Sequence, residues 1–210
     1  YIVDIVATCS GSAFLEQGSR YRIYPAISAA WLISSENFLK NSKAIGLLKL
    51  RASYGVTGYD ARLGYGLDKP NNGGGGGFTT MVGKYESGLM PGAYTSYGAS
   101  PATEYKAHPG IDLNEFGGLD LSLDFFYNNL KNIKVASSGI YSSILGLGTP
   151  YVFKGETVNK GAELSVSWKQ TIGDIHWHIG GTVSYTKDKI LEMGEEYHPY
   201  PWMYRTGHSM

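Results

Sequence analysis

Hydrophobic and polar residues alternate most regularly between Val158 and Lys189. In the first half of this stretch, every second residue is apolar: Ala162, Leu164, Val166 and Trp168. The second half continues with Ile175, Trp177, Ile179, Val183 and Tyr185. Successive side chains of a strand point to opposite faces, so both halves predict strands with one apolar and one polar face. Between them, Gly173-Asp174 predicts the tight turn of a hairpin.

Alternation of varying regularity predicts five earlier strands, clearest at Leu119–Asn129, which brings the expected number to seven. They span Tyr1–Cys9, Arg20–Ile33, Ala44–Thr57, Thr103–Leu113 and Leu119–Asn129. Pro25 interrupts the second strand, where a proline removes a ladder hydrogen bond or marks a bulge. The segment Ser34–Ser42 has room for one short helical turn. An all-β, antiparallel chain is therefore expected.

The connections between these strands are alternately short and long. Gly58–Ser100 and Lys131–Thr157 are long, whereas Glu115–Gly118 and the hairpin turn are short. Long and short connections should lie at opposite ends of an antiparallel sheet. The glycine run at 73–77 has no following Gly-Lys-Ser/Thr, so a flexible loop is predicted there instead of a phosphate site. Strands longer than ten residues with this loop asymmetry are typical of a transmembrane β-barrel.

Composition narrows the possible functions. The 18 basic and 18 acidic residues balance, so the basic excess typical of nucleic-acid binding is absent. The longest apolar run, near Ala26–Ile33, is too short for a transmembrane helix. Cys9 is the only cysteine, which excludes an internal disulfide. It is expected to be a buried or lipid-facing small residue.

Candidate catalytic and metal-binding residues are few. His176 and His178 share a strand face, but no third ligand is fixed near them, so they are interpreted as ordinary polar residues. Asp120 and Asp124 lie roughly 13 Å apart along a strand, too far for paired carboxylates acting on a glycosidic bond. No nucleophile elbow is present. An enzyme, a cofactor or a metal is therefore not expected.

Aromatic residues gather in the segments Tyr85–Tyr105 and Tyr197–Tyr204. Aromatic faces beside amide and hydroxyl groups suit sugars or peptides. The candidate substrate-binding residues are Tyr94, Tyr97, Tyr200 and Trp202. The alternative is that these aromatics belong to an interfacial girdle. For Asn159-Lys160-Gly161, a role in the strand, with Gly161 allowing close approach or a bulge, is favoured over substrate contact by Lys160.

Four stretches carry a family resemblance. They are YPAISAAWLISSENFL at Tyr24–Leu39, LLKLRASYGVTG at Leu47–Gly58, GLDLSLDFFYNNLKN at Gly118–Asn132 and ETVNKGAELSVSW at Glu156–Trp168. In this order and spacing the chain resembles the SusC-like branch of TonB-dependent outer-membrane transporters. The resemblance implies a barrel of about 22 strands around a plug, of which seven strands are about a third. Residues 1–210 are then expected to lie in the barrel domain, with the plug and the TonB box outside this sequence.

The resemblance also implies a function. It implies active import of an oligosaccharide or peptide across the outer membrane, driven by the TonB complex through the missing N-terminal part. A SusD-like surface lipoprotein, the rest of the barrel and outer-membrane lipid are the implied partners, and nucleic acid is not. The alternatives are a passive outer-membrane pore or structural barrel protein, and a secreted β-sandwich binding module.

Three structural expectations follow if the chain is part of a barrel. The residues expected to face lipid are Leu121, Leu123, Phe125, Trp168, Ile179 and Val183, and those expected to face the lumen are Asp120, Asp124, Glu163, His176 and His178. Seven strands would leave two unpaired edges in lipid, which is costly, so the outer strands are expected to pair with strands outside this sequence. Leu191–Met210 is expected to run outward as a loop.

Overall fold

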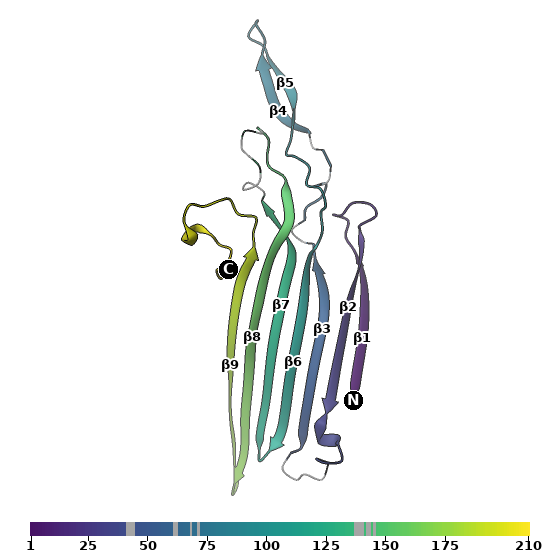
Figure 1. Cartoon of the computed structure of the whole chain (residues 1–210), viewed down its shortest axis with the longest axis vertical. Helices are drawn as coiled ribbons and strands as arrows, with labels where there is room; N and C mark the ends of the chain where they lie inside the picture. The colour runs from purple at the N-terminus through teal and green to yellow at the C-terminus, as the bar shows by residue number, and fades with distance from the viewer. Residues whose placement is uncertain are drawn as a thin grey trace.

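A single antiparallel sheet dominates the structure (Figure 1), a computed structural model that describes residues 1–40, 45–60, 63–67, 69–70, 72–136, 141, 144 and 146–210. The strands are β1 (Ile2–Gly11), β2 (Tyr21–Leu32), β3 (Leu47–Tyr59), β6 (Ala102–Phe116), β7 (Leu119–Ala136), β8 (Tyr151–Ile172) and β9 (Ile175–Glu192). Their order in the sheet is β1-β2-β3-β6-β7-β8-β9, and every pairing is antiparallel. All seven predicted strands and the all-β fold class are confirmed.

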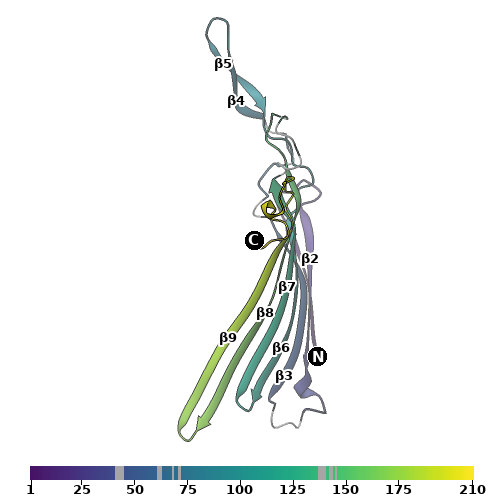
Figure 2. The ribbon, with the colours of Figure 1, turned by 60° about the vertical axis from the view of Figure 1, so that its left-hand side comes forward.

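Over the described residues, the sheet forms one curved layer with no second layer packed on either face (Figure 2). Buried apolar side chains are few among the described residues: Leu15, Leu63, Val135, Val158 and Ile190. A β-sandwich would instead bury one whole sheet face against another sheet about 10 Å away. The secreted β-sandwich alternative is therefore wrong for the described part of the chain. In that part, no helix is both long and apolar enough to span a bilayer.

One face of the sheet is apolar along its whole width. Paired residues point to the same face, and the register links Leu119 with Trp168 and then Ile179. By the same pairing and alternation, this face carries Leu121, Leu123, Phe125, Trp168, Ile179 and Val183. On β9 the apolar residues run from Ile175 to Tyr185, about 33 Å of strand at the usual rise per residue, which is a height of about 25 Å at the roughly 40° tilt of barrel strands. That height is close to the apolar band of transmembrane barrels, about 25 Å.

The opposite face is polar. Asp124 pairs with Glu163, which pairs with Ser184, so these three side chains share a face. Asp120, His176 and His178 fall on the same face by alternation. The predicted division of residues between an apolar and a polar face is confirmed.

The first predicted loop contains a hairpin. Strands β4 (Asn72–Thr79) and β5 (Tyr85–Pro91) form a separate two-stranded sheet that projects beyond the main sheet (Figure 1). The prediction of a flexible glycine loop is therefore wrong, because the glycines at 73–77 belong to β4. Glycine has low strand propensity, but here the backbone ladder with β5 orders it. The ring of Tyr85 lies against the backbone of Gly77, where any side chain would collide with it.

The second predicted loop is shorter than expected. β7 continues to Ala136 and β8 begins at Tyr151, so residues 131–136 and 151–157 are strand instead of loop. The alternation is hidden because the register shifts between Leu130 and Ile133 and again between Ile133 and Lys134. Asn132 has a φ of 57°, an uncommon left-handed conformation for a residue other than glycine. An irregularity of this kind moves side chains to the other face and breaks a period-2 pattern.

The C-terminal segment leaves β9 at the end of the long connections and then folds back (Figure 1). β9 ends at Glu192, the short 3-10 helix η3 (Pro201–Met203) follows, and the chain then returns to β9. Ile190 N–H donates to the carbonyl of His208, and Gly207 N–H donates to the carbonyl of Ile190. The prediction of a loop for Leu191–Met210 is therefore confirmed from Met193 onward, apart from η3. Its outward course is wrong at the end, because the last residues fold back and bond to the edge of β9.

Two local predictions concern the end of β2 and Pro25 within it. A 3-10 turn, η1 (Ile33–Ser35), follows β2, and Trp31 Nε1 donates to Glu36 Oε1 at 2.8 Å just beyond it. The predicted helical turn is thus confirmed at its start, while residues 41–42 lie outside the described residues. Pro25 causes no bulge in the β1–β2 ladder. Instead β2 pairs with β3 only from Ala26 onward, so Pro25 lies where that ladder ends.

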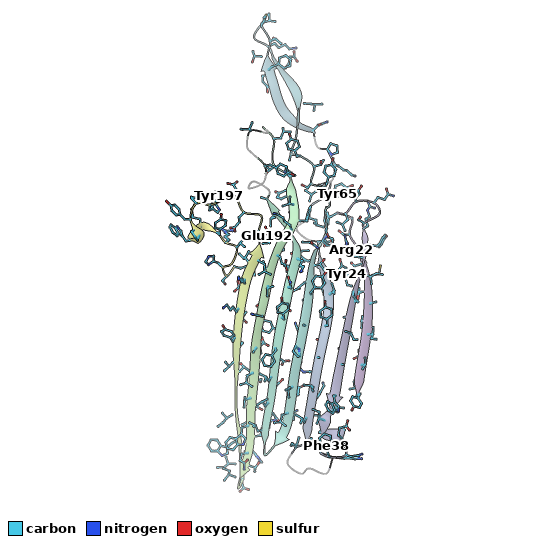
Figure 3. The ribbon with its side chains drawn as sticks, in the orientation of Figure 1. Arg22, Tyr24, Phe38, Tyr65, Glu192 and Tyr197 are labelled. Carbon is cyan, nitrogen blue, oxygen red and sulfur yellow. The ribbon has the colours of Figure 1, made fainter. Side chains whose placement is uncertain are left out.

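The two kinds of connection lie at opposite ends of the sheet, as predicted (Figure 1). The short turns use left-handed glycines: Gly117 and Gly118 have φ of 59° and 87°, and Gly173 has 63°. Figure 3 shows Tyr65 and Tyr197 at the end of the long connections, with Arg22 and Glu192, and Phe38 at the other end. We call the first of these the loop end and the second the turn end.

Candidate functional site

Arg51 joins three strands on the polar face. From β3, its Nε lies 3.0 Å from Asp112 Oδ2 on β6, and its Nη2 lies 2.6 Å from Asp124 Oδ1 on β7. Ser122 donates its hydroxyl to Asp112 Oδ1 at 2.8 Å. Gly110 lies between Arg51 and Asp124 in the register, and a Cβ there would be 3.0 Å from the Arg51 Cζ. Gly110 thus leaves space for this polar cluster.

The polar cluster is partly exposed to solvent and carries a net negative charge. The three charged side chains are 34%, 22% and 31% exposed, so they contact solvent while bonded to each other. One guanidinium beside two carboxylates leaves a net negative charge, and Glu163 lies next to Asp124 on the adjacent strand. Sequence reasoning placed Asp124 on this face but missed Arg51 and Asp112 as its partners. Arg51 and Asp124 meet because both pair with Gly110, and no local sequence motif predicts this strand register.

Two other polar residues singled out in the sequence, Asp120 and His176, have local partners. Lys169 Nζ lies 2.8 Å from Asp120 Oδ2, and Thr171 Oγ1 is hydrogen-bonded to His176 Nδ1 at 2.9 Å. Within the described ranges, no three His, Cys, Asp or Glu residues are placed to hold a metal ion. Alternation puts Lys160 on the apolar face, which disfavours the substrate contact considered for it. A side chain on Gly161 would collide with the ring of Phe126, in agreement with the close approach predicted there.

Tyr94 and Tyr97 lie at the loop end, in the segment of residues 92–101 that connects β5 to β6. We call this segment the strap. Tyr94 N–H donates to the carbonyl of Gly148 at 3.1 Å, and Ser96 N–H donates to the carbonyl of Leu67 at 2.7 Å. Ser96 is only 2% exposed, and its hydroxyl accepts a bond from Tyr151 N–H at 2.8 Å. The backbone of the strap is therefore fixed, while the Tyr97 side chain is 80% exposed. Such an ordered support with an exposed ring is suitable for ligand contact.

Tyr200 and Trp202 form a stacked pair on the C-terminal segment. Their ring centroids are 4.6 Å apart with an interplanar angle of 10°. The side chains are 52% and 75% exposed, so the stack presents a broad aromatic surface to solvent. Tyr204 fixes the loop beneath it, since its hydroxyl bonds both the N–H and the carbonyl of His198.

Glu195 closes the base of this loop. Its carboxylate accepts bonds from Arg205 N–H at 2.7 Å and from Thr206 N–H and Oγ1 at 2.8 Å and 2.7 Å. Partial burial raises the pKa of Glu195, but the hydrogen bonds lower the pKa by more than burial raises it. The pKa therefore lies below its ordinary value of 4.5. The carboxylate is therefore ionised at neutral pH and holds the two ends of the loop together.

The structure does not unite the four predicted binding residues. Tyr94 and Tyr97 lie on the strap between β5 and β6, whereas Tyr200 and Trp202 lie beyond β9 (Figure 1). Over the described residues, no hydrogen bond or ring contact joins the two pairs. They are two separate aromatic surfaces at the loop end.

Sequence reasoning also missed a cavity at the loop end. It has a volume of about 370 Å³. Its lining comes from six regions of the chain: Tyr59, Leu63, Ala102, Leu130, Asn132, Ile133, Lys134, Thr157, Met193 and Met210. Most of these side chains are apolar, and Lys134 Nζ donates to the carbonyl of Leu63 at 3.2 Å. Because these regions are distant in sequence, no motif predicts the cavity.

Comparison with known proteins identifies relatives of this chain. No protein-family model matches it. TonB-dependent receptor P26 of Formosa agariphila is 28% identical over 204 residues, which cover 92% of this chain and 19% of the receptor. TonB-dependent receptor P3 of the same organism is 27% identical over 92% of this chain. TonB-dependent receptor SusC of Bacteroides thetaiotaomicron is 33% identical over 28% of this chain. The chain spans about a fifth of the length of the Formosa receptors.

Solved structures share the fold. The RagAB peptide importer in its open-open state superposes with a TM-score of 0.76 at 18% identity, covering 90% of this chain and 20% of that one. A second structure, of the RagAB peptide transporter, superposes with a TM-score of 0.73 at 17% identity. The predicted resemblance is thus confirmed by both kinds of comparison: over most of its length this chain is similar to TonB-dependent receptors, over a shorter segment it is similar to SusC, and it has the fold of one part of RagAB.

Proposed function

We propose that this chain is a sector of the barrel wall of an outer-membrane importer that takes up a nutrient oligosaccharide or peptide. The observation that carries the proposal is the single-layer antiparallel sheet with one apolar and one polar face. A sheet of this kind is stable where the apolar face meets lipid and the polar face meets water. The names of its relatives, receptors and transporters, agree with import and name no enzyme.

The sector needs neighbours on both sides in a membrane. β1 and β9 are the edge strands of the sheet, and unpaired backbone groups in lipid cost several kcal/mol each. We propose that β1, and β9 as far as the residues before Ile190, pair with further strands of the same barrel; Ile190 itself is already bonded by residues 207–208. Residues 1–210 then all belong to the barrel domain, with the plug and the TonB box elsewhere in the protein.

The proposed transport is active. The relatives are named TonB-dependent receptors, so we assign energy coupling to the TonB complex. One relative is SusC itself and the structural neighbours are RagAB, so a SusD-like surface lipoprotein is the proposed partner at the loop end. This orientation puts the β4–β5 hairpin and the aromatic surfaces outside the cell.

The substrate is assigned by class. We propose that Tyr94 and Tyr97 on the strap, and the Tyr200–Trp202 stack, contact it on the outer side. Exposed aromatic rings on hydrogen-bonded backbone suit the faces of sugar rings and the side chains of peptides equally. The RagAB structures are titled as peptide transporters, which supports the peptide alternative for this fold.

Uptake by cells tests the proposal. Cells producing the intact protein that contains this chain would be given one pool of fluorescent oligosaccharides and one of fluorescent oligopeptides. Accumulation of one pool that stops when TonB is deleted is the expected result. Accumulation that persists without TonB would favour the passive pore, and accumulation of neither pool would contradict nutrient import.

A further inference from the structure

Three lysines cluster on the apolar face of the sheet near the loop end. Lys160 on β8 and Lys187 on β9 are direct partners in the register, and Lys189 follows two residues later on β9. Directly opposed side chains have Cβ atoms about 5 Å apart, and residues two apart on a strand are separated by about 7 Å. All three lysines are exposed. We call this group the lysine cluster.

Nearby acids do not neutralise the lysine cluster. In the described part of the chain, no salt bridge involves any of its members. Asp188 points to the other face and accepts bonds from Ser209 and Met210. On the apolar face, Glu156 is engaged by Lys131 at 3.4 Å and by Asn129 at 2.9 Å. Like charges directly opposite each other destabilise a sheet, so an anion bound between Lys160 and Lys187 would relieve their repulsion.

The lysine cluster lies at the boundary of the apolar band. Tyr127 is the register partner of Lys160, and Tyr185 precedes Lys187 by two positions on the same face. Below them the face continues with Ala162, Leu164 and Val183. Tyrosines and lysines beside an apolar band mark the depth of lipid headgroups. A molecule bound here would place its anion on the lysines and its apolar part on the band.

We propose that the lysine cluster binds the phosphate group of a phosphorylated lipid in the outer leaflet. Each ammonium offers three donors, and the spacing allows three of them to converge on one phosphate. The acyl chains of the same lipid would cover the apolar face around Leu164 and Val183, which a free phosphate ion could not do. The inference rests on the proposed membrane location, with the loop end outside, and adds a lipid-binding site to it.

Lipid binding by paired variants tests the inference. The intact protein that contains this sheet would be purified in neutral detergent and titrated with diphosphoryl lipid A or with phosphatidylcholine. Native mass spectrometry counts the bound lipid. In the double variant K160Q/K187Q, lipid A binding should be about thirtyfold weaker, on the scale of two lysines at an anionic membrane surface. Phosphatidylcholine binding should stay the same.

A matched control removes the same charge from the polar face. K49Q/K106Q should bind lipid A as the unchanged protein does. Equal lipid A binding by K160Q/K187Q and the unchanged protein would overturn the inference, and so would full occupancy by millimolar inorganic phosphate alone. A protein that stays monodisperse without detergent and binds neither lipid would instead overturn the proposed membrane function.

Discussion

Arg51 reaches Asp124 across a strand that lies between them, and their side chains come within 2.6 Å because the intervening residue is Gly110. An ideal Cβ on Gly110 would be 3.0 Å from the Arg51 Cζ. The glycine therefore determines whether β3 and β7 can be joined over β6. Charge-assisted bonds of this kind are stronger than neutral ones, even where solvent reaches them.

Replacing this glycine should weaken the sheet. We expect G110A to lower the free energy of unfolding by about 1–3 kcal/mol, as overpacking does, because the methyl group displaces the Arg51 guanidinium. Thermal unfolding of the intact protein in detergent measures the change. G181A is the control, since a Cβ on Gly181 meets nothing within 4 Å, and it should stay within about 0.5 kcal/mol. Equal effects of the two variants would contradict the role given to Gly110.

Removing one ring of the external stack should weaken substrate binding. W202A removes the outer ring of the pair with Tyr200, and we expect affinity for the imported oligosaccharide or peptide to fall roughly threefold to tenfold. Isothermal titration with the pool that cells accumulate gives the affinity. Y197A is the control, because Tyr197 is exposed on the same segment and is not part of the stack. Loss of affinity in Y197A alone would refute the assignment.

Acid should open the loop that carries this stack. The pKa of Glu195 in the folded protein lies below its ordinary value of 4.5 because its hydrogen bonds outweigh partial burial. A lowered pKa contributes stability that is complete above pH 4.5 and is lost as the pH falls through the folded value. Hydrogen-exchange protection of the Arg205 and Thr206 amides should therefore be constant from neutral pH down to about 5 and decrease below 4.5.

The variant E195Q separates this effect from general acid unfolding. An uncharged amide accepts more weakly, so protection at Arg205 and Thr206 should be lower at neutral pH and should lose its acid dependence. Protection of β7 amides serves as the internal reference. A variant that keeps the original acid dependence would show that another group controls the loop.

The two ends of the sheet should differ in access from outside the cell. In a C9S background, M81C at the tip of the β4–β5 hairpin should react with a membrane-impermeant maleimide on intact cells. D174C in the β8–β9 turn should react only after the cells are broken. Labelling of D174C alone on intact cells would reverse the proposed orientation.

Alternation identified the strands wherever the ladder is regular. From Ala162 to Trp168 and from Ile175 to Tyr185, pairing has no register shift, and the pattern in the sequence equals the pattern in space. Near Asn132 the register shifts twice, so the alternation is interrupted and residues 131–136 of β7 could not be predicted as strand. The glycines of β4 have no side chains to alternate, and only their pairing with β5 makes them a strand.

The candidate sites were predictable only in part. The aromatic character of Tyr200 and Trp202 is visible in the sequence, whereas their separation from Tyr94 depends on which strands lie between them. The Arg51 cluster depends on the pairing of β3 with β6 and of β6 with β7. Long-range register of this kind is set by the whole sheet, and no short motif specifies it.

The central claim is that one face of this sheet meets lipid and the other meets water. Nitroxide labels at neighbouring β9 positions, V183C and S184C in a C9S background, test it directly in the intact protein in lipid bilayers. Electron paramagnetic resonance then compares collisions with oxygen, which concentrates in lipid, and with a water-soluble nickel chelate. We expect the label at 183 to favour oxygen and the label at 184 to favour the chelate. Equal access of the chelate to both positions, or the opposite preference, would contradict the barrel-wall account.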